Sequence, residues 1–309
     1  MDESDRTASL MSPAKLAQLK PKPATTPAAW LTQMAADAGH MHVKRIGELG
    51  EQLRGQARLP GLAAVAGRLE KLADDLPDLD FSMLEQPRGL WARTLGKGKG
   101  GAAGSEFAHR FEEVGGEATD VAAAAIALGA DPKGEGAQME RALVELEVEY
   151  RAVEKIIDQG ARWLQDMRNQ IKVRQAAATD PQAHRAVLED SARCDILVDR
   201  LKMLRALCNA CSPVPELARA YVHKRGALVQ ALRQSLASEV DDWHGMLSPV
   251  ADAAAEGKAA VQSVQPLLDA HKDLQATAKK AIGACQQLLS QEQELARSLA
   301  ALSTPQFPL

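Results

Sequence analysis

Aromatic side chains are scarce in this chain of 309 residues, because phenylalanine, tryptophan and tyrosine together make up only 3%. The apolar residues, 46% of the total, are mostly alanine, leucine and valine, with few β-formers other than valine. Small and medium aliphatic side chains of this kind favour long helices packed side by side. The composition therefore argues against a β-rich protein and against an α/β enzyme.

The chain also lacks a dominant charge, a disulfide scaffold and a long apolar run. Its net charge is −4, from 41 acidic and 37 basic residues, so we expect no strong field for nucleic acid or an anionic membrane. Four cysteines are too few for a disulfide scaffold. The longest apolar stretch, residues 121–130, is about half a membrane span, and the acidic start MDESDRTASL is no secretory signal. We expect a soluble cytoplasmic protein.

One apolar seam dominates the middle of the chain. Its positions are spaced alternately four and three residues apart: Met139, Leu143, Leu146, Tyr150, Val153, Ile157, Gly160, Leu164, Met167 and Ile171. Only Gly160 among them is not apolar. The spacing predicts one helix about 50 Å long with a narrow seam, as in a coiled coil. Because a helix cannot bury such a seam alone, the chain must supply further helices.

Proline and glycine divide the chain before this helix. Residues 1–26 predict a flexible tail. Thr26 and Pro27 predict the cap and first residue of a helix that ends at Pro60 and Gly61. This helix is expected to bury Leu31, Met34, Met41, Ile46, Leu49 and Leu53.

A second, short helix precedes a glycine-rich segment. It presents Leu62, Val65, Leu69, Leu72 and Leu76 on one face and ends at Pro77. Residues 96–104 predict a flexible Gly/Lys linker. The linker separates an N-terminal helical region, residues 27–95, from a main bundle, residues 105–303, which a short tail, residues 304–309, follows.

The main bundle begins with a helix that Ser105 is expected to cap. Its seam is Phe107, Phe111, Val114, Ala118, Val121, Ala125 and Leu128. The turn at residues 131–136 predicts that this helix and the long helix after it form an antiparallel hairpin.

Two more prolines, Pro181 and Pro213, bound the next helix. Asp180 is its expected cap, and its seam is Val187, Cys194, Leu197, Leu201, Leu204, Cys208 and Cys211, with Asp190 as a polar exception. After Pro215 a helix with looser spacing is expected to bury Leu217, Tyr221, Leu228, Leu232, Leu236, Val240, Trp243 and Leu247, and to stop at Pro249.

The last helix carries Leu267, Leu274, Ala278, Ala281, Cys285, Leu288, Leu295, Leu299 and Leu302, with His271 and Glu292 as polar residues in its seam. The seams together predict an all-α protein. We expect long antiparallel helices packed as an elongated coiled-coil-like bundle, with a smaller N-terminal helical region.

Cys208 and Cys211 form a C-x-x-C pair, a spacing found in metal sites and redox motifs. Both nevertheless occupy seam positions, as do Cys194 and Cys285, the other two cysteines. A free cysteine in such a place behaves as a small apolar residue. We therefore interpret all four as core residues and expect no metal and no cofactor, with thiol chemistry at Cys208 and Cys211 as the alternative.

Residues 96–101 place lysines between glycines, but no strand precedes them and no lysine precedes serine or threonine, as a P-loop requires. The alternative to a linker is contact of Arg93, Lys97 and Lys99 with an anion or a membrane surface. His40 and His42 point about 200° apart on a helix, so they cannot share one metal ion. Because no carboxylate pair or nucleophile motif indicates catalysis, we expect no enzyme.

Several segments resemble the toxic-anion-resistance family, the TelA-like proteins linked to tellurite resistance. FAHRFEEVGGEATDVAAAAIALGAD is similar to that family's helix before its hairpin turn, and MERALVELEVEYRAVEKIIDQGARWL to the long helix after it. RLKMLRALCNACSPVPEL and ALVQALRQSLASEVDDWHGML are similar to its later segments, including Pro215, Ser235 and Trp243. The resemblance covers roughly half the chain. It implies an all-helical cytoplasmic protein associated with resistance to oxyanions such as tellurite, and no catalytic residues.

We therefore expect a non-enzymatic helical protein that acts in stress resistance through protein–protein interaction, with a partner protein or as a homodimer. One alternative is a thiol-based oxyanion or redox handler. The other is a membrane-surface scaffold whose membrane contact is peripheral. Nucleic acid is not expected as a partner.

Overall fold

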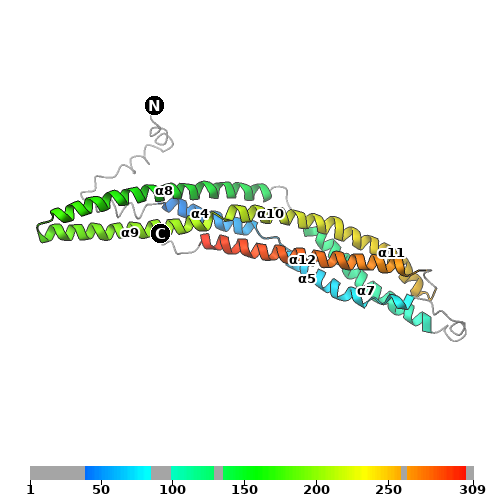
Figure 1. Ribbon diagram of the computed structural model, residues 1–309. Helices are drawn as coiled ribbons and strands as arrows, with labels where there is room; N and C mark the ends of the chain where they lie inside the picture. The colour runs from blue at the N-terminus through cyan, green and yellow to red at the C-terminus, as the bar shows by residue number, and fades with distance from the viewer. Residues whose placement is uncertain (1–38, 85–98, 129–134, 259–262, 304–309) are drawn as a thin grey trace, which may run out of the picture. The chain divides into compact units, whose positions relative to one another are not determined.

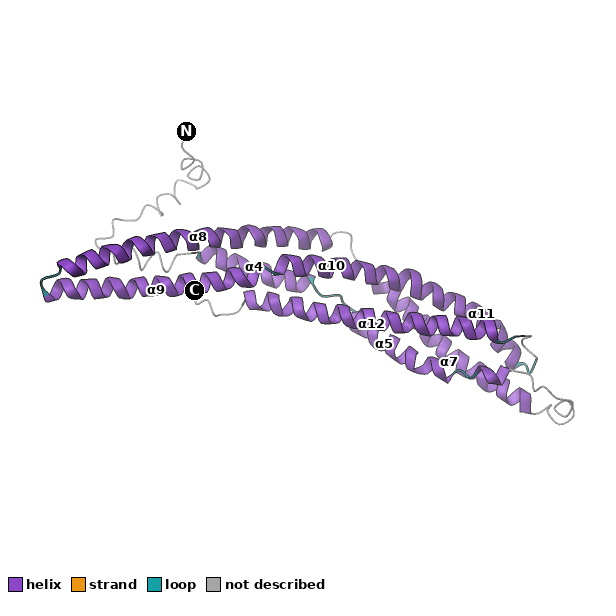
Figure 2. Cartoon of the chain, in the orientation of Figure 1, coloured by secondary structure: helices purple, strands orange, loops and turns teal. Residues whose placement is uncertain are grey.

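The computed structural model describes residues 39–84, 99–128, 135–258 and 263–303. Every regular element within these ranges is a helix (Figure 2), so the predicted all-α class is confirmed. In chain order (Figure 1) the elements are α4 (His40–Gln56), α5 (Leu62–Asp75), the 3₁₀ turns η1 (Leu76–Asp78) and η2 (Phe81–Leu84), α7 (Lys99–Leu128), α8 (Glu135–Ala177), α9 (Pro181–Cys211), α10 (Val214–Ala231), the π-helical turn η3 (Leu232–Leu236), α11 (Ala237–Ala255) and α12 (Gln265–Leu302).

The chain forms two compact units that alternate along the sequence. Unit 1 consists of Met1–Gln52, Ala142–Pro215 and Ser298–Leu309, and unit 2 consists of Leu53–Arg141 and Glu216–Arg297. This grouping differs from the predicted separation of residues 27–95 from residues 105–303. The physical reason is packing, because α5 and η2 lie against α7 in unit 2.

In unit 1, α8 and α9 run antiparallel along the predicted long seam. Gly160 of α8 lies against Leu201 of α9, and the Cys208 thiol donates a weak hydrogen bond of 3.6 Å to the Tyr150 carbonyl. Tyr150 and Leu164 are half-buried, and the other eight seam positions of α8 are buried. The α8 seam predicted from spacing is therefore confirmed.

The start and end of α9 also follow the prediction. The Asp180 side chain accepts a hydrogen bond of 2.8 Å from the backbone N–H of Ala183, which is an N-cap contact ahead of Pro181. The helix ends at Cys211, before Pro213. All seven predicted seam residues of α9 are buried, and so is the polar exception, Asp190.

Helix α4 begins at His40, and the predicted cap and first residue of this helix, Thr26 and Pro27, lie outside the described residues. Gly39 has a φ of +73°, a left-handed conformation that suits glycine, and α4 starts directly after it. Ile46 and Leu49 are buried as predicted, but the prediction for Met41 is wrong, because it is exposed. Met41 lies five residues before Ile46, which is about 140° around the helix from the buried face. The predicted contacts of Leu31 and Met34 lie outside the described residues.

In unit 2, α7 packs against α11 and begins inside the segment predicted as a linker. A Cβ on Gly104 would lie 2.6 Å from the Ala254 carbonyl oxygen, so this glycine permits close contact between the two helices. Ser105 is an exposed residue within α7, and the predicted cap at this position is wrong. The seven predicted seam residues from Phe107 to Leu128 are buried.

Within the two units, α7 and α8 have different packing partners. Unit 2 contains α7, together with its packing partners α5 and α11. Most of α8 belongs to unit 1, where α9 is its antiparallel neighbour. An apolar seam specifies that a helix needs a partner, but the seam spacing is the same for many partners.

Helices α10 and α11 are joined without a break by η3. Leu228, Leu232, Leu236 and Val240 are all buried and lie four residues apart. A wider, π-helical turn keeps such evenly spaced residues on one face, and this accounts for the looser spacing seen in the sequence. The predicted stop at Pro249 is wrong, because α11 continues to Ala255. Gly257, with a φ of +69°, donates its N–H to the Ala254 carbonyl at the actual end.

Helix α12 carries the last predicted seam, and all nine of its apolar seam residues are buried. Its two polar seam residues have defined contacts. The ring of buried His271 lies 5.0 Å from that of Phe81. Glu292 accepts hydrogen bonds of 3.3 Å from the Leu59 backbone N–H and the Tyr221 hydroxyl. These polar residues therefore connect α12 to other elements of unit 2.

Candidate functional site

The predicted anion or membrane contact cannot be placed in the fold. Arg93 and Lys97 lie outside the described residues, and Lys99 is the first residue of α7, with its side chain outside the description. No helix within the described ranges is long and apolar enough to cross a membrane.

The four thiols are buried, and the interpretation of the C-x-x-C pair as core is confirmed. Burial raises the pKa of Cys208 to about 11, that of Cys211 to about 12 and that of Cys285 to about 11. Burial also raises the pKa of Cys194. Because the thiolate is the reactive form, thiols of this kind react slowly near neutral pH.

The two histidines near the start of α4 have different surroundings. His42 Nδ1 lies 2.6 Å from Glu149 Oε2 of α8, so it takes part in a contact between helices. His40 is half-buried. In the described part of the chain, no group of three or more His, Cys, Asp or Glu side chains is arranged to hold a metal ion.

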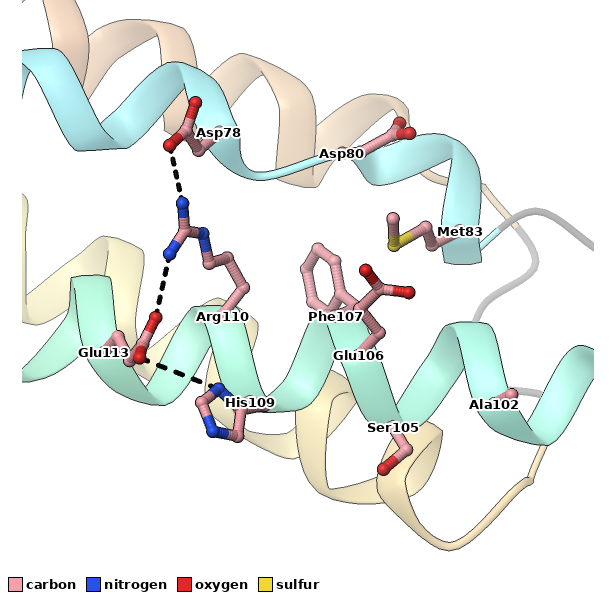
Figure 3. Close-up of a pocket in the computed structure, with 10 residues that line it drawn as sticks. All are labelled: Asp78, Asp80, Met83, Ala102, Ser105, Glu106, Phe107, His109, Arg110 and Glu113. Carbon is pink, nitrogen blue, oxygen red and sulfur yellow. Dashed lines mark hydrogen bonds and ion pairs between the residues drawn. The ribbon is translucent and has the colours of Figure 1, made fainter.

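Unit 2 contains an open groove of about 790 Å³ between the η1–η2 segment and the first half of α7 (Figure 3). Four carboxylates line it: Asp78 and Asp80 on one side, and Glu106 and Glu113 on α7. Hydrogen bonds from the side chain and the backbone N–H of Ser82 lower the pKa of Asp80. The groove is therefore predominantly acidic at neutral pH.

Arg110 links the two walls of this groove (Figure 3). Its Nη2 lies 2.7 Å from Asp78 Oδ2, and its Nη1 lies 2.9 Å from Glu113 Oε2. Hydrogen bonds to Glu113 and Asp78 raise the pKa of the guanidinium above its ordinary value. Asp78 and Glu113, two of the four carboxylates, thus share the Arg110 guanidinium as a partner. Glu113 has a second neighbour in His109, whose Nδ1 lies 3.8 Å from its Oε1.

Behind the groove lies a cluster of the chain's few aromatic residues. Phe107 lines the groove and packs edge-on against Phe81, with their ring centroids 5.6 Å apart. Phe81 contacts His271, whose ring centroid is 6.2 Å from that of Trp243. Trp243 in turn packs on Phe111. The cluster joins η2, α7, α11 and α12, which fixes the position of the groove's inner wall.

This groove is not predicted by the sequence. Asp78 and Asp80 follow Pro77, the predicted end of the short helix, where acidic residues have no helical periodicity to place them. The clue in the sequence was the spacing of Phe107 and Phe111 on α7, because scarce aromatic residues four apart on one helix indicate a particular packing contact.

Large exposed apolar side chains are concentrated in unit 1. Of the eight that the described residues contain, two belong to unit 2, Ile126 and Met246. The other six lie on α4, α8 and α9 of unit 1: Met41, Val144, Val148, Val173, Leu188 and Ile196. The outward helix faces of unit 1 are therefore a second candidate surface.

Comparisons with known proteins give no relative for this chain: no family model, no curated protein and no solved structure matches it.

Proposed function

We propose that this chain is a non-enzymatic helical protein that acts by binding another protein. The observation that carries the proposal is the set of six exposed apolar side chains on unit 1. Exposed apolar side chains on helices are typical anchors for a partner helix. From the resemblance of the sequence to the toxic-anion-resistance family, we further propose that the process it serves is resistance to oxyanions such as tellurite.

The state of the thiols supports a binding role over direct reduction of an oxyanion. A thiol reductant must meet its substrate and must ionise, and Cys208 and Cys211 are buried, with pKa values of about 11 and about 12. In this proposal the cysteines contribute to packing, and the chemistry of resistance belongs to a partner.

Complementation in a tellurite-sensitive strain of the native host tests this proposal. A variant with all four cysteines replaced by alanine should protect as well as the natural chain, provided that circular dichroism shows equal helicity. Chemical cross-linking in the same cells should attach the chain to a discrete partner. Loss of protection in the folded cysteine-free variant, or the absence of any cross-linked partner, would contradict the proposal.

A further inference from the structure

Two ion pairs fix how α4 and α8 lie together in unit 1. His42 Nδ1 is 2.6 Å from Glu149 Oε2, and Arg45 Nε is 2.6 Å from Glu145 Oε1. As the residue number rises by three on α4, that of its partner falls by four on α8. The two helices are therefore antiparallel neighbours, and residues next to each pair lie at the same level.

Three exposed apolar side chains each precede one of these paired residues. Met41 precedes His42 and is 71% exposed. Val144 and Val148 precede Glu145 and Glu149, and they are 50% and 60% exposed. One residue is about 100° of helix rotation. On both helices this rotation turns away from the buried side, so Met41, Val144 and Val148 flank the row of ion pairs on its solvent side. We call these three residues the α4–α8 face.

The acids in the row of pairs have basic partners within the chain. Arg45 pairs with both Glu145 and Glu48, and His42 Nδ1 lies within hydrogen-bond distance of Glu149.

Lysines extend the face in both directions. Lys155 is exposed and follows Val148 by seven residues, two helical turns along the same side of α8. Lys44 is exposed one turn after Met41 on α4. A partner that contacts the α4–α8 face thus meets aliphatic side chains bordered by ammonium groups.

We propose that the α4–α8 face binds an acidic amphipathic helix of another protein. Apolar residues of that helix pack on Met41 and Val148, and its carboxylates pair with Lys44 and Lys155. The anchors are aliphatic, without the tryptophan or tyrosine that membrane-interface surfaces favour, so a protein helix fits this face better than a lipid surface. The inference rests on the proposed function and assigns it a surface and a partner chemistry.

A designed peptide tests the assignment with the full-length protein. The probe is a fluorescein-labelled helical peptide of 21 residues with leucine at the heptad contact positions and glutamate beside them. Fluorescence anisotropy at low and at 0.5 M salt should show binding that weakens at least tenfold in high salt. A matched peptide with lysine in place of glutamate should bind at least tenfold more weakly.

Matched variants on the same helix separate this face from the rest of α8. Val148→Asp should weaken peptide binding at least tenfold, and Lys155→Glu at least threefold. Val173→Asp and Lys172→Glu, exposed residues of the same types elsewhere on α8, should leave binding unchanged. Circular dichroism establishes that all four variants are folded.

Several results would overturn the assignment. One is that the glutamate peptide does not bind at 1 mM protein. Another is that the glutamate and lysine peptides bind equally well. A third is that Val148→Asp and Val173→Asp weaken peptide binding to the same extent. Sedimentation with phosphatidylserine vesicles that Val148→Asp abolishes would mean a lipid surface, and a dimer that Val148→Asp dissociates would mean a second copy. A cross-linked cellular partner retained by Val148→Asp would leave the proposed function standing and refute this surface alone.

Discussion

Gly104 and Gly116, both in α7, should respond in opposite ways to replacement by alanine. A Cβ on Gly104 would lie 2.6 Å from the Ala254 carbonyl oxygen, a backbone atom that cannot move cheaply, whereas a Cβ on Gly116 would meet nothing within 4 Å. We expect Gly104→Ala to destabilise the protein by about 1–3 kcal/mol through overpacking. Gly116→Ala should stabilise it by about 0.5–1 kcal/mol through helix propensity. Urea unfolding of both variants checks this prediction, and a stabilised Gly104→Ala would contradict the close approach.

Because His271 is buried, we expect the stability of the protein to depend on pH. Burial lowers the pKa of this ring, against a smaller, opposing effect of the Leu76 carbonyl. The unfolded chain therefore binds a proton at a higher pH than the folded chain does, so this contribution to stability is complete above about pH 6.5 and is lost as the pH falls.

The variant His271→Phe isolates that contribution. The free energy of unfolding of the natural chain should decline more steeply from pH 7.5 to pH 5 than that of the variant, as measured by urea denaturation at each pH. Parallel slopes would mean that His271 does not titrate differently in the two states.

At the scale of elements, Glu292 links α12 to α10 and to the connection between α4 and α5. Its carboxylate accepts from the Leu59 N–H and from the Tyr221 hydroxyl, which is on a side chain only 1% exposed. Glu292→Leu leaves both donors without this acceptor and should cost about 1–3 kcal/mol. Glu292→Gln keeps one carbonyl acceptor and should cost less. Thermal unfolding of the two variants ranks them, and a reversed order would argue against the hydrogen bonds.

Because of the π-helical turn η3, we expect the effect of deleting one residue to depend on where the deletion falls. A π turn contains one residue more than an α turn, so deletion of the exposed residue Gln234 can convert η3 to α-helix while α10 and α11 keep their orientation. Deletion of Gly245, exposed within α11, instead rotates the following seam by about 100°. We expect the first variant to remain folded by circular dichroism and the second to lose most of its stability. Equal damage would contradict the role assigned to η3.

At the scale of the whole molecule, seam membership was predictable and helix pairing was not. The spacing of Leu197, Leu201 and Leu204 identified buried positions because burial depends on local periodicity. The choice of α9 as the neighbour of α8 depends on side-chain fit, as between Gly160 and Leu201, which no single helix reveals.

Two kinds of local signal in the sequence are ambiguous for a physical reason. Glycine in a helix that needs close contact is indistinguishable in sequence from glycine in a linker, so the sequence predicts a linker at Gly104. Proline lacks an N–H but can be tolerated inside a helix, as Pro249 is in α11. The acidic groove at Asp78 and Asp80 was missed because short 3₁₀ turns carry no long periodic pattern.

The apolar seams of the described helices, thiols included, face inward. Reaction of the native, full-length chain with a thiol reagent such as Ellman's reagent at pH 7.5 tests this most directly. The account predicts that Cys194, Cys208, Cys211 and Cys285 all stay unreacted over minutes and that all four react once urea unfolds the chain. Rapid labelling of any of the four in the folded protein would contradict it.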